Sequence, residues 1–507
     1  MTTIVQEIEN QTDSVLSSNQ LYIDYKDQWQ YLLESYLGGN AYREGNHLTR
    51  YQTETGAEYQ ARLRSTYLDN HCQSVVSVYN SFLFREAPRR DFAVWGERED
   101  VNSFLQDCDY DDRSLDAFMK DVSTWSSVFG HCWIIMTKPS IGAVTVADEV
   151  AADVRPYLNL ITPLVCLDWR YSRGINGRYS LSYLKYIEEI NGNQKTVKIW
   201  TPEYVRTTTV NIDDAGVEES VVEDTVEENG LGMIPAVLAY NRRSMFKGIG
   251  VSDIADIADA QRSIYNCNSE IEQSVRLDSH PSLVLTPDTQ AGIGAGSFIH
   301  MPENLDPGLK PYVLDFDGAN IQNILSNIAG ITESIDKMAN TGGVRATESR
   351  TLSGVAMETE FQLLNSRLAE KSSNLELAEE HLWKLYAQYQ DLEGKPDIDY
   401  PGSFNIRDNI GAMDQLVKAK SIAVDPNTHQ IIDRELLELL GEDPQDVDAI
   451  MEHPTLEDAE KTPHIQQMIM EGYTDQAILD LHPEVTQADI VRAKEQLLNL
   501  PGATEDA

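Results

Sequence analysis

The sequence has few cysteines and no long apolar run. Its five cysteines are odd in number and widely spread, and none forms a Cys-x-x-Cys pair. This usage is typical of free thiols in a reducing compartment, so we expect no disulfide framework. No apolar stretch approaches the ~20 residues of a membrane-spanning helix. The N-terminal residues MTTIVQEIENQ lack the basic and apolar regions of a signal peptide, so we expect neither a leader nor a membrane partner.

The sequence also lacks the motifs of common catalytic sites. No GxxxxGK[ST] loop, HxxxH pair, nucleophile elbow or Cys–His signature occurs. The glycine-rich stretch Gly292–Gly296 lies between two short apolar segments, which favours a loop tip over a dinucleotide site. Acidic pairs such as Asp111-Asp112 are common, but a chain with 82 acidic residues contains them by chance. We therefore expect no enzymatic activity, no cofactor and no metal.

Positive charge is scarce. The chain has 40 Lys and Arg against 82 Asp and Glu, a formal net charge of −42. This balance excludes an ordinary DNA reader, which carries a basic face. Two interpretations remain open. The charge serves solubility alone, or it belongs to a surface that lies close to DNA without binding it.

What is present is a long chain with two kinds of periodicity. At 507 residues it can form more than one core, because single cores stop growing near ~250–300 residues. Helical spacing predicts helices within 24–40, 60–88 and 101–129, with Trp29, Leu32, Leu33, Tyr36, Leu37 and Tyr67 among the inward residues. Alternation then predicts strands from about 132 to 136 and from 155 to 240, including a hairpin with Asn191-Gly192 in its turn. The acidic stretch 212–230 fits an exposed loop or edge.

Helices return after residue 250. A broad apolar stripe, opened by Ser252 as a cap, predicts a helix over 251–278. Residues 283–301 indicate a small strand–loop–strand, and a second apolar stripe predicts a helix over 318–339. The inward residues expected on these helices are Ile254, Ile257, Ala258, Ile264, Ile271, Val275, Ile321, Ile324, Leu325, Ile328, Ile331, Ile335 and Met338. The pattern as a whole indicates an α+β fold that is predominantly helical.

A very long helix follows from Ser353 to about 393. Ser353 fits the N-cap, Leu352 and Met357 fit a hydrophobic staple, and Gly394 with Pro396 marks the end. At ~1.5 Å per residue it would measure roughly 60 Å. Its apolar seam is interrupted only by Lys371. A coiled-coil strand is one interpretation. Four apolar residues off the seam favour a spoke embedded in a larger body: Leu363, Leu377, Trp383 and Tyr386.

The order of these elements resembles that of the portal proteins of tailed bacteriophages, of siphovirus and myovirus type. These proteins form the ring at the capsid vertex through which DNA enters and leaves. The resemblance covers roughly residues 25–400 and rests on the order of several stretches: YLGGNAYREGNHL, NHCQSVVSVYNSFLFREAP, LITPLVCLDWRY, GMIPAVLAYN and SDIADIADAQRSIYNCNSEIEQS.

The resemblance implies a role for each region of the chain. Residues 1–250 and the long helix 353–393 would form the wing, with the first ~20 residues loose. Helices 251–278 and 318–339 would form the stem around the channel, and residues 279–317 the clip. Residues 340–352 would be the tunnel loop. Residues 394–507 would form the crown and a C-terminal helical segment.

The resemblance also implies partners and sites. It implies a ring of twelve copies of the chain at the capsid vertex of the virion, assembled in the host cytoplasm. The partners would be double-stranded DNA passing through the channel without sequence preference, the terminase large subunit, a head–tail adaptor, and the major capsid and scaffolding proteins. The DNA channel would be lined by Lys337, Asn340, Thr341, Gly342, Gly343, Val344, Arg345, Ala346, Thr347, Glu348, Ser349 and Arg350. The clip residues that dock the motor and adaptor would be Thr286, Asp288, Gln290, Ile293, Phe298, His300 and Glu303.

Within the tunnel loop, Arg345 and Arg350 are the candidate DNA contacts, and Gly342-Gly343 would let the loop change conformation. These arginines could instead pair with Glu348 or with a neighbouring subunit. The C-terminal stretch 471–498 resembles a small helix-turn-helix-like module of antitoxin-associated proteins. It has no basic cluster, which favours a packing role in the crown. Two other functions stay open: a coiled-coil scaffold that forms dimers or trimers, and an acidic hydrolase with paired carboxylates.

Overall fold

The computed structural model describes residues 14–139, 154–213, 216–279, 319–345 and 354–404. It also describes short pieces between 282 and 314 and isolated positions between 416 and 494. The chain divides into two compact units, Met1–Asn405 and Ile406–Ala507. The first unit contains the main hydrophobic core.

Helices form the first part of the first unit. They are α2 (Gln20–Leu37), α3 (Gly39–Glu44), α4 (Gly56–Ser65), α5 (His71–Leu83), α6 (Glu99–Gln106) and α7 (Leu115–Phe129). The helix expected over 60–88 is two helices, because Thr66 is extended and Asn70 caps α5 through the amide of Gln73. Tyr67 therefore lies in the break and is 65% exposed, so its expected inward position is wrong. Leu37, also expected inward, is exposed.

Two antiparallel sheets follow. The three-stranded sheet has the order β3 (Tyr157–Ile161), β2 (His131–Thr137), β9 (Ala236–Tyr240). The five-stranded sheet has the order β4 (Cys166–Arg173), β5 (Tyr179–Asn191), β6 (Gln194–Trp200), β7 (Tyr204–Ile212), β8 (Glu218–Glu228). Asn191 pairs with Gln194 across the predicted turn, and Gly192 has a positive φ of 58°. The expected hairpin is confirmed, and the acidic stretch is the edge strand β8.

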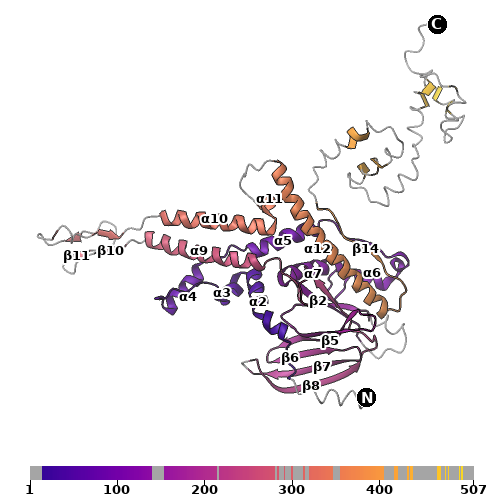
Figure 1. Ribbon diagram of the computed structural model, residues 1–507, viewed down its shortest axis with the longest axis horizontal. Helices are drawn as coiled ribbons and strands as arrows, with labels where there is room; N and C mark the ends of the chain where they lie inside the picture. Colours follow the sequence, from indigo (N-terminus) through magenta and orange to yellow (C-terminus); the bar gives the residue numbers. More distant parts are fainter. Residues whose placement is uncertain are drawn as a thin grey trace, which may run out of the picture. The chain divides into compact units, whose positions relative to one another are not determined.

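The two helices after residue 250 lie side by side and lead away from the sheets (Figure 1). They are α9 (Ala255–Ser279) and α10 (Ala319–Ala339). Between them, β10 (Ser282–Val284) pairs with β13 (Tyr312–Leu314), and β11 (Gln290–Ala291) pairs with β12 (Ile299–His300). The expected strand–loop–strand is thus two short antiparallel pairs.

The apolar stripes of α9 and α10 are buried only where the helices meet the body. Ile254, Ile257 and Ile264 are buried near the start of α9, and Ile335 is buried near the end of α10. Farther from the body, Val275 and Leu325, both expected inward, are exposed in the single chain. Met338, in the last turn of α10 and also expected inward, is exposed as well. The apolar stripes of α9 and α10 are therefore longer than the part of them that the rest of the chain buries.

The long helix α12 spans Gly354–Tyr389 and ends before the predicted Gly394. Its seam packs against the chain's own β2, β9 and β14, and Lys371 is buried in it. Trp383 and Tyr386 are buried, and Phe104 contacts both rings. The embedded spoke is confirmed for this half, although Leu363 and Leu377 are exposed. Because the chain's own core covers the described seam from Leu364 onward, this part of α12 does not offer the apolar stripe that the coiled-coil alternative requires.

A short strand after α12 moves the predicted domain boundary. Strand β14 (Asp397–Asp399) pairs with β1 (Arg89–Asp91). The buried Glu379 of α12 accepts hydrogen bonds from Arg90, Trp383 and Tyr400. These contacts tie residues 397–404 to the first unit, so the division falls after Asn405 and not at the expected residue 394.

Three further expectations meet the structure here. All five cysteines are free thiols, as expected. Among the described residues, no helix is long and apolar enough to cross a bilayer. In the second unit, the predicted C-terminal module contributes Ile478, Ile490 and Ala493 to a small core with Ile465 and Met468, which fits packing within that unit.

Candidate functional site

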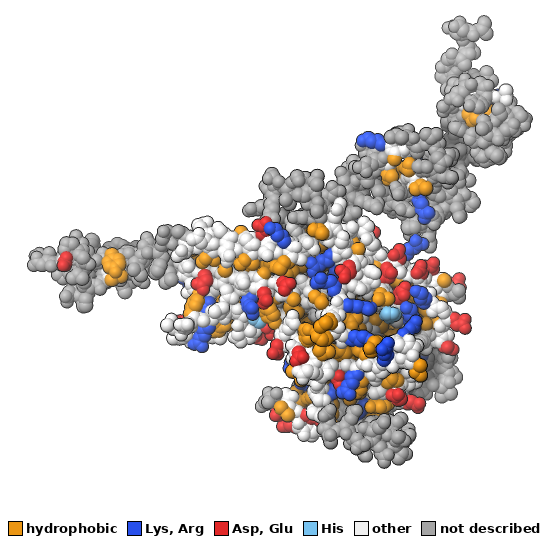
Figure 2. Space-filling view, viewed as in Figure 1, with side chains coloured by type: hydrophobic (Ala, Val, Ile, Leu, Met, Phe, Trp, Pro, Cys, Tyr) orange, Lys and Arg blue, Asp and Glu red, His pale blue; other side chains and the backbone are white. Residues whose placement is uncertain are grey.

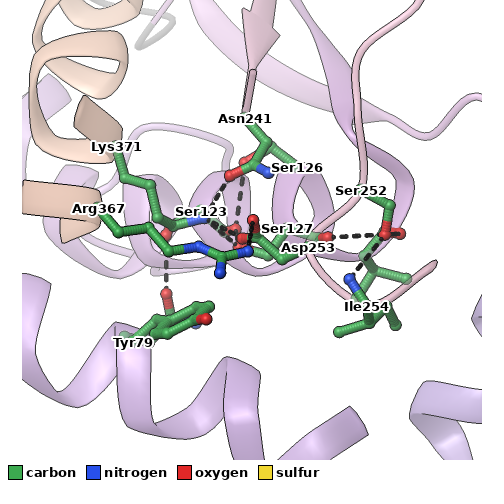
Figure 3. A network of polar contacts seen from close by, with 12 residues as sticks. Tyr79, Ser123, Ser126, Ser127, Asn241, Ser252, Asp253, Ile254, Arg367 and Lys371 are labelled. Carbon is green, nitrogen blue, oxygen red and sulfur yellow. Dashed lines mark hydrogen bonds and ion pairs between the residues drawn. The ribbon is translucent and has the colours of Figure 1, made fainter. Parts of the chain in front are cut away.

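A buried polar junction lies where α9 begins and α10 ends. We define the junction as Ser127, Asn241, Asp253, Arg367 and Lys371 (Figure 3). These residues come from α7, the segment after β9, the segment before α9, and α12. The junction therefore joins the sheet-bearing body to both helices of the α9–α10 pair.

Lys371 is the centre of the junction. Its ammonium donates to Ser127 Oγ at 2.7 Å, to Asp253 Oδ2 at 2.6 Å and to Asn241 Oδ1. The three acceptors match the three protons of an ammonium group. The one polar interruption of the apolar seam is thus a buried, fully hydrogen-bonded cation.

Arg367 links the segment before α9 to the end of α10 by hydrogen bonds to both. One nitrogen, Nη2, donates to Asp253 Oδ1 at 2.9 Å, and Nη1 donates to the carbonyl of Met338 at 3.0 Å. The Tyr79 hydroxyl donates to the next carbonyl, that of Ala339, at 2.6 Å. Together these contacts fix the last turn of α10 directly before residues 340–352.

The charges of the junction stabilise one another. Burial alone opposes the negative charge of Asp253, but the Lys371 and Arg367 cations outweigh it and hold the pKa of the carboxyl at about 2. Burial lowers the pKa of the Lys371 ammonium, and Asp253 opposes that effect. Asp253 therefore stays ionised through the neutral range, between two cations.

The backbone in front of α9 is held by a close crossing. Gly130 ends α7 with a φ of 90°, and a Cβ placed on it would lie 2.5 Å from the carbonyl carbon of Gly250. Ser252, the expected cap, lies two residues before the N-cap position; its hydroxyl accepts the amide of Ile254 and donates to the carbonyl of Val128. The start of α9 is therefore fixed to the end of α7.

The expected channel residues begin at a helix end, not in an open loop. Asn340 has a φ of 55°, and the amides of Asn340 and Thr341 donate to the carbonyls of Lys337 and Asp336. This is a Schellman motif with asparagine at the left-handed position. Gly342–Arg345 then form the short helix α11. The expected flexible loop therefore starts as an ordered turn.

Two of the expected channel residues, Thr341 and Gly342, are buried in the single chain. Val344 is exposed, and Lys337 is exposed and paired with Glu333 at 3.0 Å. Gly343 and Arg345 belong to α11, and the exposure of their side-chain positions lies outside what the structure describes. Outside the described residues altogether are Ala346, Thr347, Glu348, Ser349 and Arg350.

The clip residues are described in part. Gln290 and His300 face each other as register partners of β11 and β12, and His300 is exposed. The sequence pattern did not predict that these two residues pair. The remaining expected clip residues lie outside the described residues: Thr286, Asp288, Ile293, Phe298 and Glu303.

Sequence reasoning missed Asp253 as a site residue. It is one of 82 acidic residues, and nothing in its local pattern distinguishes it. The available signal was Lys371, because a lysine in an apolar seam requires a buried carboxylate partner. The identity of that partner depends on contacts between residues more than 100 positions apart.

Two observations on the described residues concern the hydrolase alternative. Within the described residues, no group of three or more metal-ligating side chains occurs. The described lining of a hollow of about 940 Å³ contains no Asp or Glu. A paired-carboxylate mechanism would need both acids to face such a hollow.

Comparison with protein families and with curated proteins finds no match to this sequence. Solved structures do match, all at low identity. A chain of the virion of a native gene transfer agent (GTA) particle is 11% identical, with a TM-score of 0.42 over 74% of this chain and 90% of that chain. A chain of the neck of an empty GTA particle, computed with C6 symmetry, is 10% identical, with a TM-score of 0.42 over 78% and 99%. A chain of the native GTA neck, computed with C12 symmetry, is 10% identical, with a TM-score of 0.36 over 71% and 89%.

Proposed function

We propose that this chain is a structural component of a phage-type head–tail junction, specifically the portal protein. Copies of it would form a closed ring at one capsid vertex. The ring would pass double-stranded DNA during packaging and ejection, and it would dock the terminase motor and then the head–tail adaptor. In this proposal the chain is not an enzyme.

The observation that carries the proposal is the α9–α10 pair anchored at the junction. The two helices leave the body together, carry short strand pairs at their far end, and expose apolar residues that one chain leaves uncovered. Neighbouring copies placed side by side would cover those residues. The same arrangement would put the end of α10, held by Arg367, next to the channel.

The charge of the chain fits passage of DNA without retention. A wall with many ordered Lys and Arg side chains would release counterions at each phosphate and hold the duplex. A net charge of −42 per chain disfavours that. A few cations near the channel, such as Arg345 and Arg350, could still touch the phosphates without reading sequence.

Ring formation is the direct test. We expect the purified full-length protein to form closed rings with a central hole, visible by negative-stain electron microscopy and as one large species in sedimentation velocity. The uncovered apolar surface of α9 and α10 is the physical reason, because its burial would favour side-by-side packing. A protein that stays monomeric at all salt and protein concentrations would overturn the proposal.

The channel arginines give a second prediction. Replacing both Arg345 and Arg350 by Glu should lower DNA packaging or retention at least tenfold while rings still form, because four units of charge per subunit would change next to the phosphates. The readout is packaged, nuclease-protected DNA in an assembly reaction. The matched control reverses two exposed arginines of the body, Arg64 and Arg85. Equal packaging by both variants would remove the proposed DNA contacts.

A further inference from the structure

A hollow of about 940 Å³ in the first unit is basic, although the chain is strongly acidic. It lies between the start of β5, the segment 243–247, β9 and the C-terminal half of α12. Figure 2 shows basic and hydrophobic side chains gathered together on this face. The lining includes Arg178, Arg243, Lys247 and Lys384, and no Asp or Glu among its described residues. We call this hollow the basic groove.

Three cations of the basic groove are available to a partner. Arg178, Arg243 and Lys247 form no ion pair with any carboxylate that the structure describes. Lys247 lies over the ring of Tyr179 and Arg243 over that of Tyr240, so aromatic faces support both charges. Beside them, Met245 is 86% exposed. The groove thus combines positive charge with uncovered apolar surface.

Strand β8, at the other edge of the five-stranded sheet from β4, is acidic where the groove is basic. Strand β8 is exposed along nearly its whole length. Glu219, Glu223 and Glu227 form no ion pair with a described cation, in contrast to Asp224, which pairs with Arg206. Val221, Val222 and Val226 are also exposed, so the strand presents both apolar and acidic side chains. We call this strand the acidic edge.

One chain cannot place its own acidic edge in its own basic groove. The sheet order puts β4 and β5, which contribute to the groove, at one side and β8 at the other. With strands ~4.8 Å apart, β4 and β8 are separated by roughly 19 Å. Strand β8 is also held by its full register with β7. The partner with the matching surface is therefore a second copy of the chain.

We infer that the basic groove of one copy receives the acidic edge of the next copy. Such a contact is heterologous, because two different surfaces meet, and its repetition gives a ring if the rotation closes and an open filament if it does not. The closed ring rests on the proposed function, whereas the pairwise contact does not. Ion pairs around apolar contacts would fix the register of neighbouring subunits and make association salt-dependent.

Charge reversal tests the contact. The groove variant carries Arg178→Glu and Lys247→Glu, and the edge variant carries Glu223→Lys and Glu227→Lys. We expect each variant alone to associate at least tenfold more weakly than the wild type in sedimentation velocity at low salt, because like charges would meet. A control variant, Lys26→Glu with Lys120→Glu, makes the same charge change as the groove variant at exposed helix positions and should associate like the wild type.

Mixing the two variants is the decisive step. The acidic groove of one variant then meets the basic edge of the other, and the reverse pair matches as well, so a mixture should recover association that neither variant shows alone. Failure of the mixture to recover, or unchanged association of each variant, would overturn the contact. Circular dichroism verifies that each variant is folded before mixing.

The outcomes separate this contact from the proposed function. Wild-type rings that charge reversal does not weaken would overturn the contact and leave the portal proposal standing. Open filaments that charge reversal dissolves would support the contact and overturn the closed ring. An unrelated acidic peptide could also bind the basic groove. If the groove variant loses binding of this peptide while association between copies of the chain is unchanged, the occupant of the groove is not a second copy, and the inference is overturned.

Discussion

Replacing Asp253 by Asn should lower the free energy of unfolding of the first unit by about 3–5 kcal/mol. The change keeps the shape of the side chain but leaves Lys371 and Arg367 without their shared carboxylate in a buried site. Breaking one partner of a buried ion pair typically costs ~3–5 kcal/mol, because the remaining charge stays desolvated. Denaturant unfolding followed by tryptophan fluorescence measures this, since all seven tryptophans lie in the first unit.

The matched control is an exposed pair. Glu272 and Arg276 lie one turn apart on α9 with both side chains substantially exposed. Replacing Glu272 by Gln should cost less than ~1 kcal/mol, as is usual for surface pairs. A small effect of Asp253→Asn, similar to that of the control, would show that the junction does not hold the helices in place.

The pH dependence of Asp253→Asn has a defined sign. The folded pKa of Asp253 is about 2, against ~3.9 in an unfolded chain. The stabilisation is therefore fully present above about pH 4 and is lost as the pH falls through about 2. We expect the stability difference between the wild type and the variant to be constant from pH 5 to 8 and to narrow below pH 4.

Replacing Gly250 by Ala should destabilise the first unit by at least about 3 kcal/mol. A Cβ at Gly250 would overlap the carbonyl oxygen of Gly130, and the obstacle is backbone that is held by α7 and β2. Overpacking a site usually costs ~1–3 kcal/mol, and more where nothing can yield. The same fluorescence measurement applies, and a drop in soluble full-length protein would accompany it.

A glycine in open space provides the control for that change. Gly330 lies within α10, and a Cβ placed there would meet no atom within 4 Å. Replacing it by Ala should raise stability by about 0.5–1 kcal/mol, because alanine favours the helix. If Gly250→Ala behaved like Gly330→Ala, the close crossing in front of α9 would not be what fixes that helix.

The junction and the crossing act on the same part of the molecule. Both position the start of α9, and Arg367 extends that control to the last turn of α10. In the proposed ring, these are the residues between the body and the channel. A substitution at Asp253 should therefore disturb the position of residues 340–345 although it contacts none of them.

The local elements could be predicted because their signals are local. The Asn191-Gly192 turn and the alternation of β5 to β7 depend only on neighbouring residues, and the structure has them where expected. Helix breaks were predicted less well. The interruption between α4 and α5 depends on Asn70, whose side chain donates to the carbonyl of Tyr36 in α2.

For the candidate site, too, some features could be predicted from local sequence and others could not. The order of the helices around residues 340–352 is as the sequence predicted, and the role of the arginines and glycines there stays a prediction. The sequence did not reveal that Asn340 closes α10 and that Thr341 is buried, because the Schellman geometry and the packing of Thr341 depend on where the chain continues. Nor could it assign complementary charge to the two edges of the five-stranded sheet, since strand order is a property of the whole sheet.

The sequence by itself determined the acidic charge, the free thiols, the α+β class, the two helices after residue 250 and the long α12. These properties follow from composition and from periodicities of two and 3.6 residues. Only the tertiary structure decided that Lys371 contacts Asp253 and that the backbone at Gly130 packs against the backbone at Gly250. It also decided that the basic groove and the acidic edge lie at opposite edges of the five-stranded sheet. The physical reason is that burial, steric exclusion and charge pairing depend on distance in space, and residues far apart in the chain acquire that proximity only on folding.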